Sequence, residues 1–244
     1  LEQRGFLNCS ETERTIPAAA TQVMITAHGV SDHVRLKLAS TGLTVIDTTC
    51  PLVRRVHAAA QRLASEGRHV IVIGQPGHVE VRGITEDLSS YSVWPDAATV
   101  QTLAVNRLGA IAQSTTRPDV AADVLAEVRR RNAHAEIVWI DTICQPTRDR
   151  QEALEELLAV VTVLVVVGGL RSNNSRALQQ RALDHGRRAY LIQTAEELHP
   201  DWFEPDDIVG LTAGTSTPDD IIDAVASRLD QLAAMANTAD PTLR

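Results

Sequence analysis

Two stretches of this sequence, 94 residues apart, carry almost the same residues. Residues 46–50 read Ile-Asp-Thr-Thr-Cys, and residues 140–144 read Ile-Asp-Thr-Ile-Cys. At the same offset, an apolar run that ends at Gly74 corresponds to one that ends at Gly168, and each run opens into a polar loop. A repeat on this scale predicts that the chain is built from copies of one structural unit, related by pseudo-symmetry.

A third pair of matching segments extends the repeat. Residues 112–116 parallel residues 212–216, and each segment precedes a helical pattern led by proline. Three matches in register argue against coincidence. We therefore divide the chain into the remnant of a first unit whose opening half is absent (1–43), a second unit (44–136), a third unit (137–236) and a tail (237–244).

The local pattern within the units is that of parallel sheets covered by helices. Apolar, β-branched runs of four to eight residues alternate with segments of helical periodicity. The expected fold class is therefore α/β, with helices on both faces of parallel-sheet units and the first unit incomplete. The clearest predicted helices lie at 51–66, 118–131, 148–158 and 218–234, and proline near the start supports the first and the last.

Composition excludes several classes of protein. A net charge of −8 and only seven aromatic residues disfavour a nucleic-acid platform, which needs a basic face and stacking rings. The longest apolar run, residues 157–170, is too short to span a membrane, and the chain starts without a basic, hydrophobic leader. Three cysteines are too few for a disulfide scaffold. We expect a cytoplasmic protein acting on a small molecule, and residue 1, leucine, suggests an incomplete or processed sequence.

Candidate functional residues gather where predicted strands end. In open parallel sheets, ligands bind outside the carboxyl ends of the strands, where helix N-termini add positive partial charge. Neutral hydroxyls, amides and imidazoles at such ends suit an anion such as a diphosphate. The candidates are His28, Cys50, His78, Glu80, Thr115, Cys144, Ser172, Asn173, Asn174 and Ser216.

Each of these candidates has a simpler structural interpretation that the sequence leaves open. Cys50 and Cys144 are either buried small side chains or soft thiolate ligands that pseudo-symmetry directs at one iron–sulfur or zinc centre. His28 fits a helix cap, and residues 172–175 fit an N-cap cluster. Glu80 is either a favourable acid in a first helical turn or a proton donor in a dry pocket.

The combined motifs resemble one known family. The segments are Thr-Ala-His-Gly-Val at 26–30, Asp-Thr-Thr-Cys-Pro-Leu-Val at 47–53, Gly-His-Val-Glu at 77–80, Thr-Ile-Cys at 142–144 and Thr-Ala-Gly-Thr-Ser at 212–216. They are similar to 4-hydroxy-3-methylbut-2-enyl diphosphate reductase over residues 1–236. The resemblance implies a trefoil of three α/β units around a [4Fe–4S] cluster. It also implies reductive dehydroxylation of an allylic diphosphate to isopentenyl and dimethylallyl diphosphates, in the methylerythritol phosphate route to isoprenoids.

The resemblance also assigns roles to the candidates. Cys50 and Cys144 match two of three cluster cysteines, and Glu80 matches the residue that relays protons to the substrate. Thr115 matches a threonine near the hydroxymethyl end of the substrate. The residues that match diphosphate contacts are His28, His78, Ser172, Asn174 and Ser216, with Asn173 standing where the family usually has serine.

One departure from the family pattern keeps alternatives open. The family's N-terminal segment, with its first cluster cysteine and first substrate histidine, has no counterpart in this sequence. The chain is thus either a reductase that receives electrons from reduced ferredoxin or flavodoxin, or a truncated relative. Such a relative would bind a diphosphate without catalysis or be completed by another chain. A zinc hydrolase is disfavoured because no His–Glu–His ligand set occurs, and neither nucleic acid nor membrane is an expected partner.

Overall fold

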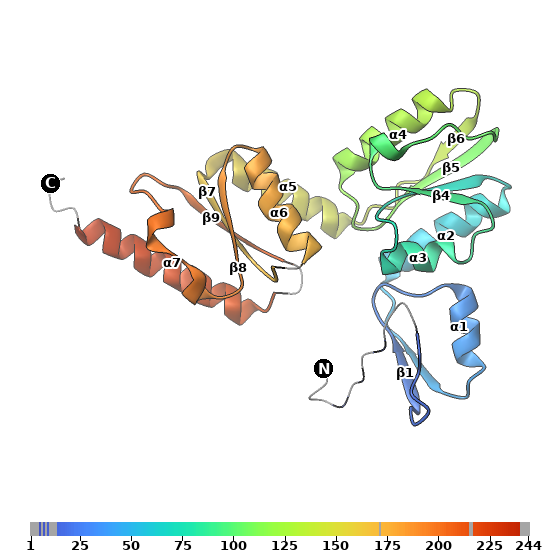
Figure 1. Cartoon of the computed structure of the whole chain (residues 1–244), viewed down its shortest axis with the longest axis horizontal. Coiled ribbons are helices and arrows are strands. Elements are labelled where there is room, and N and C mark those ends of the chain that lie inside the picture. The colour runs from blue at the N-terminus through green and yellow to red at the C-terminus, as the bar shows by residue number, and fades with distance from the viewer. Residues whose placement is uncertain are drawn as a thin grey trace. The chain divides into compact units, whose positions relative to one another are not determined.

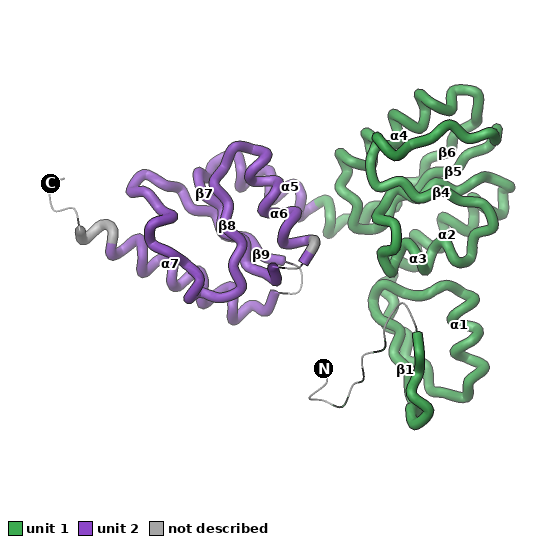
Figure 2. The backbone as a smooth tube through the Cα atoms, viewed as in Figure 1, with its two compact units in different colours: residues 1–148 green, residues 149–244 purple. Residues whose placement is uncertain are grey.

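The chain forms two compact units, residues 1–148 and 149–244, which Figure 2 shows in green and purple. The structure is a computed structural model, and it describes Gly5, Leu7, Cys9 and residues 14–170, 172–214 and 217–239, without the side chains of Asn173 and 236–239. None of the described helices combines the length and the hydropathy needed to cross a membrane.

The first unit begins with a two-stranded parallel sheet. β1 (Gln22–Ile25) pairs with β2 (Thr44–Asp47), and α1 (Asp32–Ala39) connects the two strands (Figure 1). Ser31 caps α1 by accepting a hydrogen bond from the backbone N–H of Val34 (3.2 Å). The segment predicted as a remnant, residues 1–43, thus contributes β1 and α1, and β2 lies in the segment assigned to the second unit.

A four-stranded parallel sheet follows in the same unit, in the order β4-β3-β5-β6. Its strand β3 (His69–Ile73) consists of valine and isoleucine after its first residue, as expected for a parallel strand covered on both faces. The elements are α2 (Pro51–Ser65), β3 (His69–Ile73), α3 (Val79–Thr85), β4 (Tyr91–Trp94), the 3-10 helix η2 (Ala97–Thr99), β5 (Arg107–Ala112), α4 (Pro118–Arg131) and β6 (Glu136–Trp139).

Alternate residues of β3 face two different cores. Val70 and Val72 pack with α2 and α3, whereas Ile71 and Ile73 pack with α4 on the other face. All four side chains are fully buried. The alternation fixes the register of the strand, because a slip of one residue would exchange the two faces.

The second unit has a three-stranded parallel sheet in the order β8-β7-β9. The central strand β7 is buried along its whole length. Leu164 and Val166 pack with α5 and α6, and Val165 and Val167 pack with α7 on the opposite face. The elements are α5 (Gln145–Val160), β7 (Val163–Val167), α6 (Asn173–Asp184), β8 (Arg188–Ile192), the 3-10 helices η3 (Ala195–Glu197) and η4 (Pro200–Trp202), β9 (Val209–Ala213) and α7 (Asp219–Ala239).

The α/β fold class with parallel sheets and helices on both faces is therefore confirmed. The sheets are shifted relative to the sequence repeat, because β2 pairs with β1 and β6 pairs with β5. The strand that opens each predicted unit thus closes the sheet of the unit before it. α3 begins at Val79, within the segment expected to be a polar loop, and α5 begins at Gln145 rather than at residue 148.

Candidate functional site

The two cysteine loops share one hydrogen-bonding plan. The hydroxyl of Thr48 donates to the carbonyl of Ile25, the last residue of β1 (2.6 Å). Ninety-four residues later, the hydroxyl of Thr142 donates to the carbonyl of Ala112, the last residue of β5 (2.5 Å). The repeat read from the sequence thus has this hydrogen bond in common at two strand ends.

Each cysteine is held through its backbone by the loop that follows a neighbouring strand, β1 for Cys50 and β5 for Cys144. The N–H of Cys50 donates to the carbonyl of Ala27 (3.0 Å), and that of Cys144 donates to the carbonyl of Ser114 (2.9 Å). Both side chains are half-buried free thiols. Cys50 is the N-cap residue of α2 without a side-chain capping bond, whereas the Sγ atom of Cys144 lies 3.1 Å from the hydroxyl of Thr147.

An aspartate closes each cysteine loop. Asp47 accepts from the N–H of Thr49 (2.9 Å), and Asp141 accepts from the N–H of Ile143 (3.2 Å). Both carboxylates also form an ion pair with an arginine four residues after the cysteine: Asp47 with Arg54 (3.2 Å) and Asp141 with Arg148 (2.5 Å). Sequence reasoning missed these two arginines, although they share the 94-residue offset.

Glu80 lies in the first turn of α3 and is only 1% exposed. Its Oε1 atom accepts from the backbone N–H of Ser114 (2.7 Å), and its Oε2 atom accepts from the hydroxyl of the same residue (2.8 Å). Burial raises the pKa of Glu80 above its ordinary value, although the Ser114 hydrogen bonds and the charge of His28 act in the opposite direction. The carboxyl is therefore a group that retains its proton to higher pH than a solvated glutamate.

Two histidine rings lie beside this carboxyl. The centroids of the His28 and His78 rings are 5.4 Å apart in an edge-to-face arrangement. His78 caps α3, because its Nδ1 atom accepts from the N–H of Glu80 (3.2 Å). Nδ1 therefore carries no proton in this arrangement, and the Nε2–H of His78 is its donor. His28 is exposed in the turn after β1 and does not cap α1, a role that Ser31 has.

These contacts connect five of the predicted residues within the first unit. The backbone N–H of Cys50 donates to the carbonyl of Ala27, the residue before His28. The ring of His28 packs against that of His78, and His78 caps the helical turn that contains Glu80. Ser114 then joins Glu80 to the N–H of Cys144. The structure thus links Cys50, His28, His78, Glu80 and Cys144 by a chain of contacts at the strand ends, in which each cysteine takes part through its backbone N–H. Ser114 joins Glu80 to Cys144 in this chain of contacts and is not among the candidates that the sequence indicates.

Thr115 follows Ser114 and accepts a hydrogen bond from the amide of Gln113 (3.2 Å). The hydrogen bonds of this loop change the alignment between residues 112–116 and residues 212–216 that the sequence predicted. The N–H of Gln113 donates to the carbonyl of Ile73 (2.8 Å), as that of Gly214 does to the carbonyl of Val167 (2.9 Å). The offset in this loop is therefore 101 residues, not the 100 expected from the proline-led helices.

The hydroxyl groups that close these loops confirm the corrected offset. The hydroxyl of Thr116 donates to the carbonyl of Ile73, and the hydroxyl of Thr217 donates to the carbonyl of Val167. Both hydrogen bonds are 3.0 Å long. With an offset of 101 residues, Thr115 aligns in sequence with Ser216. The same turn occurs near the start of the chain, because the N–H of Gly29 donates to the carbonyl of Thr26 as the N–H of Thr116 donates to the carbonyl of Gln113. His28, Thr115 and Ser216 consequently occupy the same sequence position in the three repeats.

The remaining predicted residues belong to the second unit. Ser172 is the N-cap of α6, because its side chain accepts from the N–H of Ser175 (3.3 Å), as the N-cap interpretation predicted. At the 94-residue offset it corresponds to His78, and the exposed Asn174 corresponds to Glu80. Asn173 is the first residue of α6, but its side chain lies outside the described part of the structure, as does the whole of Ser216.

Comparison with known proteins identifies the family. A model of the LytB protein family matches residues 1–230. The chain belongs to the LytB family. It is 40% identical over 225 residues to 4-hydroxy-3-methylbut-2-enyl diphosphate reductase of Methylibium petroleiphilum, covering 91% of this chain and 68% of that protein. The same-named protein of Vibrio parahaemolyticus is 36% identical over 252 residues, covering all of this chain and 78% of the relative.

Solved structures of LytB relatives support the same conclusion. A structure of (E)-4-hydroxy-3-methyl-but-2-enyl diphosphate reductase, described as the terminal enzyme of the non-mevalonate pathway, matches with a TM-score of 0.61 and 33% identity, over 89% of this chain and 79% of the other. The reductase from Plasmodium falciparum matches with a TM-score of 0.74 and 27% identity, over 84% and 65%. The predicted family and oxidoreductase class are confirmed, and the roles of individual residues remain predictions.

The free thiols of Cys50 and Cys144 have the chemistry of iron–sulfur ligands, but two thiols are only part of a ligand set. Soft thiolates at equivalent loops are the donors that such clusters use. Cys50 and Cys144 provide two of them. Within the described ranges, however, no group of three or more histidine, cysteine, aspartate or glutamate residues is placed to hold a metal ion.

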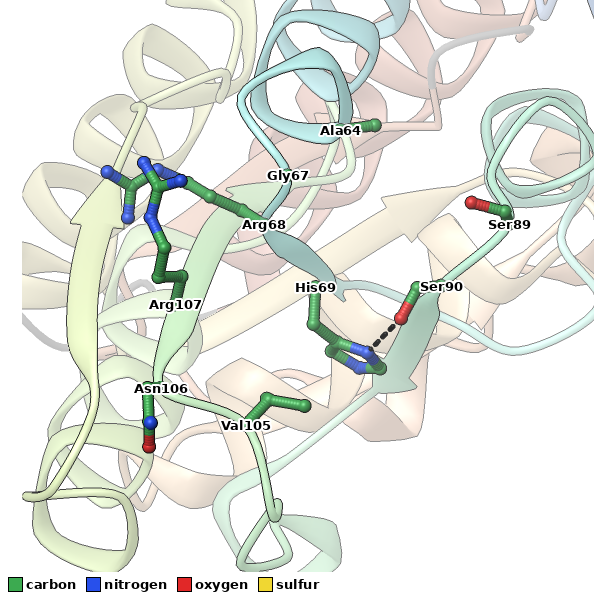
Figure 3. Close-up of a pocket in the computed structure, with 9 residues that line it drawn as sticks. All are labelled: Ala64, Gly67, Arg68, His69, Ser89, Ser90, Val105, Asn106 and Arg107. Atoms are coloured by element: carbon green, nitrogen blue, oxygen red, sulfur yellow. Dashed lines mark hydrogen bonds between the residues drawn. The ribbon is translucent and has the colours of Figure 1, made fainter.

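A cavity of about 470 Å³ lies away from these residues, at the amino ends of β3 and β5 (Figure 3). Its base is the ring of His69, whose nitrogens contact the hydroxyls of Ser90 (2.8 Å) and Ser92 (2.9 Å). Arg107, at the rim, donates to the carbonyl of Glu66 (2.7 Å) at the end of α2. His69 and Arg107 thus have hydrogen-bond partners within the protein, and the cavity lies at the edge of the sheet opposite to the LytB motifs.

Proposed function

We propose that this LytB chain catalyses the reductive dehydroxylation of 4-hydroxy-3-methylbut-2-enyl diphosphate to isopentenyl and dimethylallyl diphosphates. The observation that carries the proposal is the buried Glu80 carboxyl, held beside the His28–His78 pair at the strand ends that precede Cys50 and Cys144. The names of the curated relatives support the same substrate.

The reaction consumes two electrons and two protons, breaks one allylic C–O bond and releases water. A hydroxyl leaves readily only when it is protonated, so the site needs an acid that keeps its proton near neutral pH. Burial raises the pKa of Glu80 in that direction. We assign Glu80 the role of proton donor.

The substrate also carries a diphosphate, which needs hydrogen-bond donors. The Nε2–H of His78 and the ring of His28 are hydrogen-bond donors near Glu80 that suit a phosphate. Thr115 belongs to the loop that holds Glu80 and is assigned to the hydroxymethyl end of the substrate. The further diphosphate contacts that we propose are Ser172, Asn173, Asn174 and Ser216.

The cofactor that we propose is a [4Fe–4S] cluster, with Cys50 and Cys144 as two of its ligands. Such a cluster supplies the electrons of the reaction, which reduced ferredoxin or flavodoxin would deliver to it. Equivalent positions in the two repeats support the assignment of both cysteines.

Glu80→Gln tests the proposed role of the carboxyl, because it keeps the size of the side chain and removes its proton. In chain 1–244, reconstituted anaerobically with iron and sulfide, we expect turnover to fall about 100-fold or more, measured as substrate-dependent oxidation of a reduced dye. Substrate affinity should change by only a few-fold. Glu86→Gln, at the far end of α3, is the matched control and should retain turnover.

Two results would contradict this proposal. Full turnover of the Glu80→Gln variant would remove Glu80 from the chemistry. Substrate binding without turnover in the wild-type chain, at complete iron occupancy, would favour a non-catalytic diphosphate-binding relative. The iron content and visible absorption of each sample are measured in parallel, so that poor loading is distinguished from poor catalysis.

A further inference from the structure

The first turn of α1 takes two of its hydrogen-bond partners from a distant part of the sequence. The backbone N–H of Asp32 donates to Oδ2 of Asp87 (2.7 Å), and the N–H of His33 donates to Oδ1 of the same carboxylate (3.2 Å). Ser31, the N-cap residue, binds the next amide, the N–H of Val34. Asp87 thus binds the two amides that this cap leaves, and its negative charge complements the helix dipole.

The two elements that Asp87 joins are held in different ways. Five of the seven residues of α3 are buried, and Leu88, next to Asp87, packs in the core with α2. α1, in contrast, buries none of its residues. A short helix depends on tertiary contacts for its stability. The position of α1 therefore depends on polar contacts such as the two with Asp87.

α3 contacts the segment that leads into α1 at three places. At the start of α3, the ring of His78 packs against that of His28. In the middle, a Cβ atom at Gly83 would lie 3.5 Å from the carbonyl carbon of Val30. Beyond the end of α3, Asp87 binds the first amides of α1. This last contact fixes the end of the segment whose other end is His28.

We propose that Asp87 positions the ring of His28 relative to that of His78 by fixing the start of α1, and so sets the spacing of the two imidazoles for the diphosphate. The inference rests on the proposed function of the histidine pair. Asp87 touches neither the substrate nor the reacting atoms in this scheme. It is a positioning residue that acts through His28.

Other polar contacts at the start of α1 involve side chains. The hydroxyl of Ser31 donates to Glu86 (2.8 Å), and the amide of Gln61 donates to the carboxylate of Asp32 (2.6 Å). Side chains can turn about several torsions, whereas the two bonds of Asp87 fix the backbone itself. Glu86→Gln keeps a carbonyl acceptor for Ser31, so that variant leaves the start of α1 in place.

Asp87→Ala removes both bonds to α1. In chain 1–244 we expect the affinity for pyrophosphate, measured by calorimetry, to fall about 5-fold, because ordering the His28 turn then costs binding free energy. Removal of a negative charge would by itself strengthen the binding of an anion. The expected direction therefore separates a loss of position from a loss of charge.

Asp96→Ala is the matched control. Asp96 is also a carboxylate that caps a short helix, η2, by accepting from the N–H of Thr99 (3.0 Å). None of the proposed diphosphate ligands lies on η2, so the Asp96→Ala variant should bind pyrophosphate at least as tightly as wild type. Equal losses of affinity in Asp87→Ala and Asp96→Ala would overturn the proposal.

A double-mutant cycle tests whether Asp87 acts through His28. The His28→Ala variant and the variant that also carries Asp87→Ala should bind pyrophosphate equally, because the residue that Asp87 positions is absent from both. A loss of the same size with and without His28 would overturn the proposal. If Asp87→Ala does not fold, Asp87→Asn, which keeps one acceptor oxygen, should show a smaller loss that again requires His28, and no loss would overturn the proposal.

The contact between the two rings is measured without any ligand. In chain 1–244 with labelled histidine, the nuclear Overhauser effect between the ring protons of His28 and His78 should be weaker in Asp87→Ala and unchanged in Asp96→Ala. His28→Ala assigns the signals. An unchanged effect in Asp87→Ala would overturn the proposal. Failure of the wild-type chain to bind pyrophosphate would instead overturn the diphosphate role of the histidines, and the ring contact would still decide the role of Asp87.

Discussion

Thr48 and Thr142 form the same hydrogen bond in two repeats, but only Thr142 also accepts one. Its hydroxyl receives the N–H of Ala112 (2.9 Å) while donating to the carbonyl of that residue. In the first repeat, the carbonyl of Ile25 is shared between the hydroxyl and the N–H of Thr48. The two equivalent threonine hydroxyls therefore differ in the number of backbone groups that they bind: two for Thr142 and one for Thr48.

This difference predicts unequal effects of the same substitution. Thr142→Val leaves the buried N–H and carbonyl of Ala112 without these partners and should lower the free energy of unfolding by about 2 kcal/mol or more. Thr48→Val leaves the carbonyl of Ile25 paired with the N–H of Thr48, so we expect a loss of about 0.5 kcal/mol. Urea denaturation of both variants measures the two values, and equal losses would contradict the prediction.

Two glycines should resist substitution because helices pack directly on them. A Cβ atom at Gly109, in β5, would lie 2.8 Å from Leu63, and one at Gly210, in β9, would lie 2.7 Å from Val161. Gly109→Ala and Gly210→Ala should each destabilise the chain by about 1–3 kcal/mol through overpacking. Gly169→Ala is the control, since its Cβ would have its nearest neighbour, Ser172, at 3.9 Å. Thermal unfolding of the three variants checks this ranking.

The buried Glu80 should make stability depend on pH. Burial raises its folded pKa above the ordinary value of 4.5. The folded chain therefore binds this proton more tightly than the unfolded chain, and the resulting stability is complete below pH 4.5 and lost as the pH rises through the folded pKa. Glu80→Gln cannot ionise, so its stability relative to wild type should increase from pH 4 to pH 8. Urea titrations across this range measure the difference, and a constant difference would contradict it.

Asp47 should have the opposite pH dependence. Burial opposes ionisation, but hydrogen bonds from Thr49 and the ion pair with Arg35 outweigh it and lower the pKa of Asp47 from 3.8 to about 2. The stability it provides is present above pH 3.8 and lost as the pH falls toward 2. Asp47→Asn should therefore cost about 1 kcal/mol at pH 6, allowing for solvent screening, and progressively less below pH 4. Comparison of unfolding free energies at pH 6 and pH 2.5 checks the sign.

His78 combines a capping role with its proposed role in binding. Asparagine is a good N-cap residue, so His78→Asn should keep the stability of α3, whereas His78→Ala should cost about 1 kcal/mol. Both variants lose the imidazole donor and should bind pyrophosphate about 10-fold more weakly than wild type. Calorimetric titration and thermal unfolding separate the two effects. Normal pyrophosphate affinity in His78→Asn would leave the histidine with capping alone.

The sequence predicted the parallel strands, the main helices and the loops that contain the site, because repeats and hydrophobic period are local signals. It indicated a first helical turn at Glu80 only as one interpretation, because α3 is a seven-residue helix that contains two valines and Gly83. This helix is stabilised by burial of Val81 and Ile84 rather than by propensity. The selection of Ser114 also required the structure. Its contact with Glu80 spans 34 residues, and serine in a loop carries no signal of its own.

The one-residue difference between the loops that end at Thr116 and Thr217 has a consequence for how such repeats diverge. Both threonines bind the end of a central strand in the same way, yet Pro118 follows Thr116 after one intervening residue and Pro218 follows Thr217 directly. Length variation is therefore absorbed at the junction between loop and helix. Chimeras that exchange helices between repeats should be joined at this junction, where one residue can be gained or lost without moving the turn that precedes it.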